Sequence, residues 1–150
     1  MNLAKRKTIV FTAVLGALAV IIGAFGAHAL KKPLEKIGGL SIFETGVEYH
    51  FYHTLALGLV AALIEGDKAD QLLRWAARFF LVGVFLFSGS LYALACFKLM
   101  ELSLGFLGML TPIGGVFFIL GWGSLFLYGL KTAKADLGQT VHLVISLFIS

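Results

Sequence analysis

Residues 8–30 read TIVFTAVLGALAVIIGAFGAHAL, and this stretch decides the fold of the chain. It holds 23 residues without a single Lys, Arg, Asp or Glu, and basic residues flank it at positions 5–7 and 31–32. Because an α-helix rises about 1.5 Å per residue, an apolar helix of roughly 20 residues crosses the roughly 30 Å hydrocarbon core of a bilayer. The stretch therefore predicts a transmembrane helix.

A secretory signal is the alternative interpretation of this segment. Basic residues at 5–7, an apolar run and the triplet Ala27-His28-Ala29 imitate a signal sequence with its cleavage site. The apolar run is longer than the usual length of roughly 7–15 residues, and further apolar segments follow it. We therefore expect the segment to be retained as a membrane anchor. Cleavage would remove His28 and leave an odd number of spans.

The composition agrees with a membrane protein of one domain. Of the 150 residues, 59% are hydrophobic and 13% are charged, whereas about a quarter are charged in soluble domains. The net charge of +4 comes from short basic clusters between apolar runs, so it indicates membrane topology rather than nucleic-acid binding. Cys96 is the single cysteine and lies in an apolar run, which excludes a disulfide framework and a thiolate metal site.

Two of three further apolar segments have clear limits. The second span is predicted at residues 41–64, where Ser41 and Glu44 have the spacing of a capping box at a helix start. The third span is predicted at residues 79–97, which are 19 uncharged residues preceded by two arginines and a tryptophan typical of a membrane interface.

The fourth segment is too long for one upright crossing. Residues 102–130 are 29 uncharged residues, about 43 Å as a helix. Thr111 is a good N-cap and Pro112 fits a first helical turn, so we place the fourth span at residues 112–130. Residues 102–110 then form an apolar connector. The expected fold is an all-α bundle of four transmembrane helices.

The C-terminal tail comprises residues 131–150. Its apolar part, residues 137–150, is too short for an ordinary span and is interrupted by Gln139 and His142. An interfacial helix and a disordered end both remain open for this tail.

The basic residues predict the orientation of the bundle. With both termini in the cytoplasm, eight of them lie inside and four outside, as the positive-inside rule requires. The inner eight are Lys5, Arg6, Lys7, Lys68, Arg74, Arg78, Lys131 and Lys134, and the outer four are Lys31, Lys32, Lys36 and Lys98.

Small residues four apart occur on every predicted span. Such pairs let helix backbones approach closely inside lipid, where hydrophobicity does not hold helices together. They predict packing within the bundle, an interface between copies of the chain, or both. The pairs are Ala19 with Gly23, Gly58 with Ala62, Gly89 with Ala93, and Thr111 with Gly115.

Three histidines form the centre of the candidate polar site. His28 lies near the predicted outer end of the first span, and His50 and His53 lie near the outer start of the second. At 100° per residue, His50 and His53 are about 60° apart on a face shared with Tyr49. Histidines on neighbouring helices can ligate haem iron or a divalent metal, or relay protons. A binding site here needs His28 together with His53, with or without His50, whereas a structural role in hydrogen bonds at helix ends and loops is the favoured interpretation.

Hydroxyl groups complete the list of candidate site residues. Ser88 and Ser90 lie in the middle of the third span, where a hydroxyl bonds to its own helix or to a neighbouring one. With Thr111 they are also the residues that would line a path for a small neutral solute. The full candidate set is His28, Tyr49, His50, His53, Ser88, Ser90 and Thr111.

Charged residues are absent from the apolar parts of all four spans. Charges inside spans normally mark ion and proton pathways, so their absence weakens a proton-coupled transporter. The chain also shows no nucleophile with a neighbouring base and no glycine-rich phosphate loop. We therefore predict no catalytic residue and no enzyme activity. No cofactor is expected, although haem and a divalent metal stay open as alternatives.

Several short motifs together resemble a known family. They are GAFGAH at residues 23–28, EYHFYHTLAL at 48–57, FSGSLY at 87–92, TPIGG at 111–115, and Gly121-Trp122. The series resembles the small membrane-protein family called domain of unknown function 423, over about residues 1–130. The resemblance implies a four-span bacterial inner-membrane protein and no established activity. It also implies that His28 and His53 are retained, whereas Gln commonly stands in the place of His50.

Three functions compete. The leading hypothesis is a non-enzymatic membrane protein in the cell inner membrane that binds a membrane-protein partner or forms a homo-oligomer in the bilayer. The second is a binder of haem, metal or a lipophilic ligand through His28 and His53 at the outer face. The third is a channel or transporter for a small neutral solute.

Overall fold

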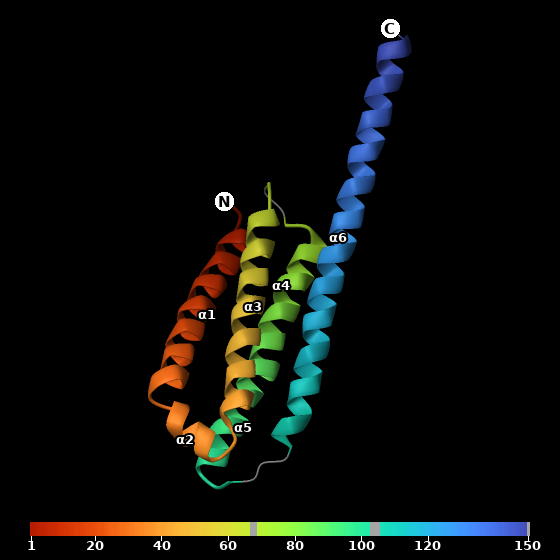
Figure 1. Ribbon diagram of the computed structural model, residues 1–150. Coiled ribbons are helices and arrows are strands. Elements are labelled where there is room, and N and C mark those ends of the chain that lie inside the picture. Colours follow the sequence, from red (N-terminus) through yellow and green to blue (C-terminus); the bar gives the residue numbers. More distant parts are fainter. Residues whose placement is uncertain (67–68, 103–105, 150) are drawn as a thin grey trace.

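The computed structural model describes residues 1–66, 69–102 and 106–149, with the backbone alone for residues 136 and 140–149. In these ranges the chain is entirely helical and has no strand, which confirms the all-α class. The elements, shown in Figure 1, are α1 (Leu3–His28), α2 (Lys31–Lys36), α3 (Leu40–Leu63), α4 (Gln71–Gly83), the π-helical turn η1 (Val84–Ser88), α5 (Gly89–Leu99) and α6 (Leu107–Ile149).

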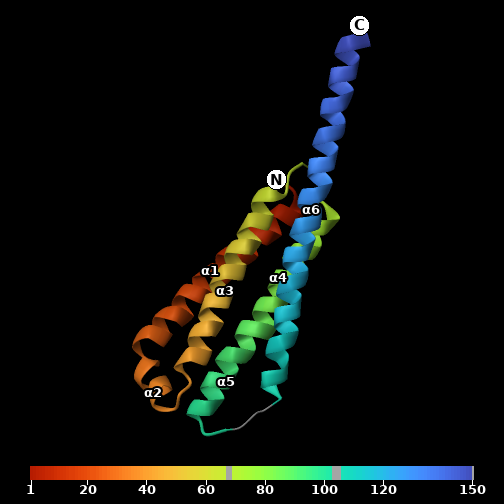
Figure 2. The ribbon, with the colours of Figure 1, turned by 45° about the vertical axis from the view of Figure 1, so that its right-hand side comes forward.

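The long helices alternate in direction and form an open row (Figures 1 and 2). α3 packs against α1 on one side and against α4, η1 and α5 on the other. α4, η1 and α5 follow one another as a single interrupted helix, against which α6 packs. α1 and α6 therefore lie at the two ends of the row, and each leaves a wide face for lipid.

Three helical segments among the described residues are long and apolar enough to cross a membrane. They are Leu3–His28, Gln71–Leu99 and Leu107–Gln139. α3, which covers the second predicted span, has 24 residues but carries two histidines and two glutamates that lower its hydropathy. It is nevertheless central to the row, with nine buried residues against four in α1. Neighbouring helices thus shield the two histidines of α3 from lipid, where polar groups would be costly, whereas Glu44 and Glu48 are exposed.

The predicted capping box at the start of the second span is wrong. α3 begins at Leu40 after the N-cap residue Gly39, which makes no side-chain capping bond. Ser41 lies within the helix, where its carbonyl accepts a hydrogen bond from the hydroxyl of Thr45. The cause is the turn before it, because Gly38 adopts a φ of 63° that suits glycine and starts the helix earlier than expected.

The predicted start of the fourth span is also wrong. α6 begins at Leu107, so Pro112 lies inside the helix. Thr111 is not an N-cap, because its hydroxyl bonds to the Ser90 hydroxyl on α5 instead. The proline is tolerated so close to the helix start because it removes only one hydrogen bond there. Part of the expected connector 102–110 is therefore helical, and residues 103–105 of it lie outside the described residues.

α6 does not end near Leu130 but continues to Ile149. Residues 131–135 read KTAKA, which favours a helix, and no proline follows Pro112. The 43 residues correspond to about 65 Å of helix, roughly twice the hydrocarbon thickness. The C-terminal part of α6 accordingly stands clear of the other helices in Figure 1.

Phenylalanine rings lie on glycines along the contact between α4 and α6, which we call the α4–α6 seam. The Phe80 ring lies on Gly121, where a methyl carbon would come within 2.5 Å of the ring. The Phe118 ring lies on Gly83 in the same way, with a corresponding distance of 2.4 Å. These reciprocal contacts bring the two helices closer than larger residues would allow.

The closest approach continues from η1 to the start of α6. A methyl carbon at Gly114 would lie 2.4 Å from the backbone nitrogen of Phe87 and 2.8 Å from its Cα. The obstacle here is backbone, which has no rotamer to change. Gly114 is therefore required for the observed approach of the η1 and α6 backbones.

The contact between α1 and α3, called here the α1–α3 seam, is looser. A methyl carbon at Gly16 would lie 3.7 Å from Thr54, and one at Gly58 would lie 3.3 Å from Thr12. Close contact occurs only toward α2, where the Phe43 ring approaches Gly26. The half of this seam nearer the N-terminus carries a surface groove, and we call it the open half.

Candidate functional site

His53 lies in an aromatic cluster between α3, α4 and α6. Its ring stacks on Phe118, with centroids 3.4 Å apart and planes 8° apart. Its Nδ1–H donates to the carbonyl of Tyr49 at 2.8 Å, and its Nε2 accepts a long hydrogen bond of 3.4 Å from Nε1 of Trp122. Both partners fit the neutral tautomer with its proton on Nδ1. Protein groups therefore engage both ring nitrogens of His53.

His50 is buried on another side of α3, toward α5 and α1. Its Nδ1 lies 3.2 Å from the hydroxyl of Tyr92. Its Nε2 is buried and has no hydrogen-bond partner among the described residues, although the Leu15 carbonyl on α1 is nearby. The two histidines of α3 thus serve different helix contacts and do not converge on one point.

The structure does not bring His28 to His53. Thr54, next to His53, faces Gly16 on α1, which is 12 residues from His28. At about 1.5 Å per residue, the two histidines differ in depth by about 18 Å. His28 is also exposed at the end of α1. The expected convergence of three imidazoles at one depth is therefore wrong, because His53 lies more than three turns inside α3.

The hydroxyl candidates are divided in the same way. Ser90 and Thr111 come together across α5 and α6, with their hydroxyl oxygens 2.7 Å apart, and Ser90 also contacts the Phe87 carbonyl. Ser88 is fully buried in η1, and its hydroxyl has no partner among the described residues. The Ser90–Thr111 pair fastens two helices to each other, so these hydroxyls are not presented to a solute.

A metal site does not emerge from these positions. Among the side chains that the structure describes, those of residues 1–66, 69–102, 106–135 and 137–139, no group of three or more His, Cys, Asp or Glu could hold a metal ion. The hypothesis of haem or metal binding through His28 and His53 also loses its geometric basis, since the two residues are far apart. His50 and His53 instead pack between helices, against Tyr92 and Phe118 respectively.

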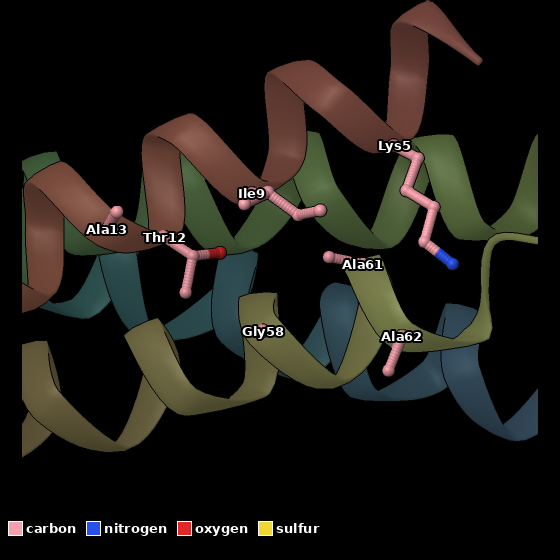
Figure 3. A pocket seen from close by; sticks show the side chains of 7 residues that line it. All are labelled: Lys5, Ile9, Thr12, Ala13, Gly58, Ala61 and Ala62. Atoms are coloured by element: carbon pink, nitrogen blue, oxygen red, sulfur yellow. The ribbon is translucent and has the colours of Figure 1, made fainter. Parts of the chain in front are cut away.

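Grooves on the surface offer a different kind of site. One of them, called the α1–α3 groove, has a volume of about 370 Å³. Figure 3 shows that it lies between α1 and the C-terminal part of α3 and that small side chains form most of its walls. Its lining residues are Lys5, Ile9, Thr12, Ala13, Gly58, Ala61 and Ala62.

The second groove lies between α1 and α4 at the same end of the molecule. This α1–α4 groove has a volume of about 290 Å³ and is lined by Lys7 and Phe11 from α1 and by Arg74, Arg78 and Leu81 from α4, among others. Cations at one end and apolar side chains further along make it amphipathic.

The third groove lies at the opposite end, near α2. It has a volume of about 330 Å³, and Glu44 and Glu48 contribute to its lining. The sequence suggests that one of these glutamates pairs with a lysine of residues 31–36. The described side chains show no such pair, since their single ion pair joins Lys131 to Asp70.

Comparisons with known proteins agree on one family. The pattern of DUF423, described as a protein of unknown function, matches residues 22–115. The UPF0382 inner membrane protein YgdD of Escherichia coli strain K12 is 40% identical over 131 residues, which are 87% of this chain and 94% of that protein. The UPF0382 membrane protein YwdK of Bacillus subtilis is 40% identical over 76% of this chain and 88% of its own length. This chain belongs to the DUF423 family.

Membership confirms the resemblance drawn from the motifs and makes the chain a membrane protein embedded in a lipid bilayer. A UPF0382 membrane protein of Haemophilus influenzae is 39% identical over 87% of this DUF423 chain and 98% of its own length. No solved structure matches the chain.

Sequence reasoning missed several partners in this DUF423 protein. Phe118 and Trp122 enclose His53, and Tyr92 faces His50, yet none of the three was a candidate. Aromatic residues are so common here, with 14 Phe alone, that composition cannot single these out. Arg74 and Arg78 were taken only as interface markers. Their shared spacing of four residues, on one helix face, was the available signal for a joint site.

Proposed function

We propose that this DUF423 protein is a non-enzymatic inner-membrane component that crosses the bilayer four times and pairs with a second copy through the α1–α3 groove. α1, α3, the α4–η1–α5 helix and α6 would be the four spans. Both termini would lie in the cytoplasm.

The distribution of basic residues supports this topology. Lys5 bonds to the Ile64 carbonyl, so the N-terminus and the end of α3 lie together, and Lys98 bonds to the Gly38 carbonyl at the opposite end. The N-terminal end carries more basic residues, which are retained in the cytoplasm. These are Lys5, Arg6, Lys7, Arg74, Arg78, Lys131 and Lys134; Lys68, expected on this side, lies outside the described residues.

The observation that carries the pairing proposal is the open half of the α1–α3 seam. Its groove of about 370 Å³ lies at the edge of the row, where no further helix of the described chain covers it. Small residues such as Ala13, Gly58 and Ala62 form its floor and rims, which is typical of surfaces where transmembrane helices meet.

The same helix also carries a shape suited to filling such a groove. On α1, Ile9 lines the groove itself and is 42% exposed, so its side chain is available to a partner. A two-fold dimer joins one patch to the same patch on its partner, so it needs groove and ridge together. α1 offers both, which favours a second copy of this chain as the partner.

The buried histidines support a non-enzymatic role. Both ring nitrogens of His53 contact protein groups, and His50 lies in the core beside Tyr92. The apolar parts of the spans contain no charged side chain that would mark an ion path. Packing accounts for these groups without a reaction.

The proposal is tested by filling the groove. Ala62→Leu places a larger side chain at an exposed groove position without entering the core. In liposomes that contain donor- and acceptor-labelled copies, the wild type is expected to give energy transfer and Ala62→Leu to lose most of it. Gly129→Leu is the control, because Gly129 is exposed on α6 with no atom near its Cβ position.

Two results contradict the proposal. One is a wild type that stays monomeric at every protein-to-lipid ratio, which would leave the groove to a different protein. The other is an equal loss of transfer in Ala62→Leu and Gly129→Leu.

A further inference from the structure

Three basic side chains converge on the α1–α4 groove at the N-terminal end of the molecule. Lys7 comes from α1, and Arg74 and Arg78 come from successive turns of α4. All three are exposed. Asp70, the carboxylate closest to them along α4, is engaged by Lys131. The groove therefore presents a concentration of positive charge.

Apolar side chains continue the groove toward the middle of the bundle. Phe11 on α1 and Leu81 on α4 each lie about one turn beyond the cations in the direction of the bilayer centre. Ala77 forms the floor between them and is buried. The groove thus changes from cationic to apolar along its length. This order complements a phospholipid, in which a negatively charged phosphate is followed by apolar acyl chains.

Trp75 fixes the depth of this groove in the membrane. The Arg78 guanidinium lies over the Trp75 ring at 4.9 Å from its centroid, and Trp75 stacks on Phe79. Tryptophan at the end of a span is typical of the headgroup level. Arg78 is also the last charged residue before the uncharged run of residues 79–97. The cations accordingly lie at the depth of lipid phosphates.

We propose that the α1–α4 groove is a binding site for an anionic phospholipid. Arg74, Arg78 and Lys7 bind the headgroup phosphate, since guanidinium groups bind phosphate oxygens through paired N–H donors. Phe11 and Leu81 pack against the first part of an acyl chain. Basic pockets between helices on the cytoplasmic side recognise such headgroups. The proposal needs the four-span orientation only to name the leaflet, and it does not need the second copy.

The test compares lipids that share acyl chains and differ in headgroup charge. The protein in mild detergent is titrated with phosphatidylglycerol or with phosphatidylcholine, and bound lipid is counted by native mass spectrometry. One tightly bound phosphatidylglycerol per chain is expected, with at least a tenfold preference over phosphatidylcholine. The triple variant Lys7→Gln, Arg74→Gln, Arg78→Gln is expected to lose this preference, because each cation near a membrane surface contributes roughly fivefold in affinity.

The other end of the molecule supplies a matched control. The variant Lys31→Gln, Lys32→Gln, Lys36→Gln removes the same amount of charge far from the groove and is expected to keep the wild-type preference. If the triple groove variant does not fold, the single variant Arg78→Gln serves, with an expected fall of about fivefold. A titration with inorganic phosphate separates a lipid site from a site for a free anion.

Three results would overturn the proposal. The first is equal binding of the two lipids by the wild type. The second is an equal loss of the preference in the groove and control variants. The third is displacement of bound phosphatidylglycerol by an equimolar amount of inorganic phosphate. Because the readout is bound lipid per chain, failure of this site leaves the pairing proposal standing, and failure of pairing leaves this site standing.

Discussion

The two outer helices are attached to the row by different kinds of seam. Along the α4–α6 seam, glycines receive phenylalanines so closely that a methyl carbon at Gly83 or Gly121 would meet a ring at 2.4 or 2.5 Å. Along the open half of the α1–α3 seam, the corresponding distances at Gly16 and Gly58 are 3.7 and 3.3 Å. One seam is complete within the chain, whereas the other leaves a groove.

This difference between the two seams shows that small residues have two separate structural roles in this bundle. Glycine opposite an aromatic ring or a backbone closes a contact within one chain. Small residues along a surface groove, such as Ala13, Gly58 and Ala62, leave a volume of about 370 Å³ that a further helix or a lipid can occupy. Glycine content alone therefore does not tell an internal contact from an external one.

The largest effect is expected at Gly114, where the close contact of the α4–α6 seam continues to η1. Gly114→Ala forces the Phe87 backbone away and should lower the free energy of unfolding by about 2–3 kcal/mol, the upper part of the range for overpacked sites. Chemical unfolding in mild detergent, followed by tryptophan fluorescence, measures this. Gly123→Ala on the same helix meets no atom within 4 Å and should change stability by less than about 1 kcal/mol. Equal effects of the two would show that the seam is not closely packed.

The next effect concerns His53, which packs on the aromatic residues of the α4–α6 seam. His53→Ala removes the ring stacked on Phe118 and leaves the Trp122 N–H without its acceptor, so a loss of about 2 kcal/mol is expected. His28→Ala, at an exposed helix end, should change stability by less than about 0.5 kcal/mol. The same unfolding assay measures the loss of stability in both variants. Comparable losses in both variants would restore the idea of a shared histidine site.

The hydroxyl pair at the start of α6 should contribute less. Ser90 and Thr111 form one interhelical hydrogen bond, and such bonds in membrane proteins average about 0.6 kcal/mol. A double-mutant cycle with Ser90→Ala and Thr111→Val is expected to give a coupling energy of this size. A coupling indistinguishable from zero would mean that the two hydroxyls act separately.

The smallest effect concerns the ion pair that joins the N-terminal end of α4 to α6. The Lys131 ammonium, bonded to Asp70, holds the pKa of that carboxyl below its ordinary value, and the Leu72 N–H acts in the same direction. The resulting stabilisation is therefore present above about pH 4 and is lost as the pH falls through the lowered pKa.

For an exposed pair, a few tenths of a kcal/mol are expected. Melting temperatures between pH 2.5 and 7 should fall slightly less for Asp70→Asn than for the wild type on acidification. A variant that loses stability as steeply as the wild type would exclude this pair as a source of the pH dependence.

Much of the fold could be predicted from the sequence, because long runs without charged residues identify the segments that cross the lipid bilayer. Residues 8–28 of the first run and all of residues 79–97 fall within helices, and the basic residues before each run mark one end of the molecule. Helix starts were harder, as at Gly39 and Leu107, because a cap depends on the turn before it. The π-helical turn η1 left no signal in the sequence.

The candidate site was less predictable, because it depends on how one helix is shifted along its neighbour. The contact of Gly26 with Phe43 sets the level of α3 beside α1 and separates His28 from His53. Neither periodicity nor spacing reports that shift. Gly114 and Gly121 belong to motifs of the fourth span, but their partners Phe87 and Phe80 could not be derived from the sequence.

The most direct test of the account is a cross-link across the open seam. A single cysteine at Ala13, exposed beside the groove on α1, is introduced into a Cys96→Ser background and oxidised in native membranes. The account predicts a covalent dimer from Ala13→Cys and none from Ile119→Cys, which is 71% exposed on α6 at the other end of the row. Cross-linking at Ile119 without cross-linking at Ala13 would contradict it.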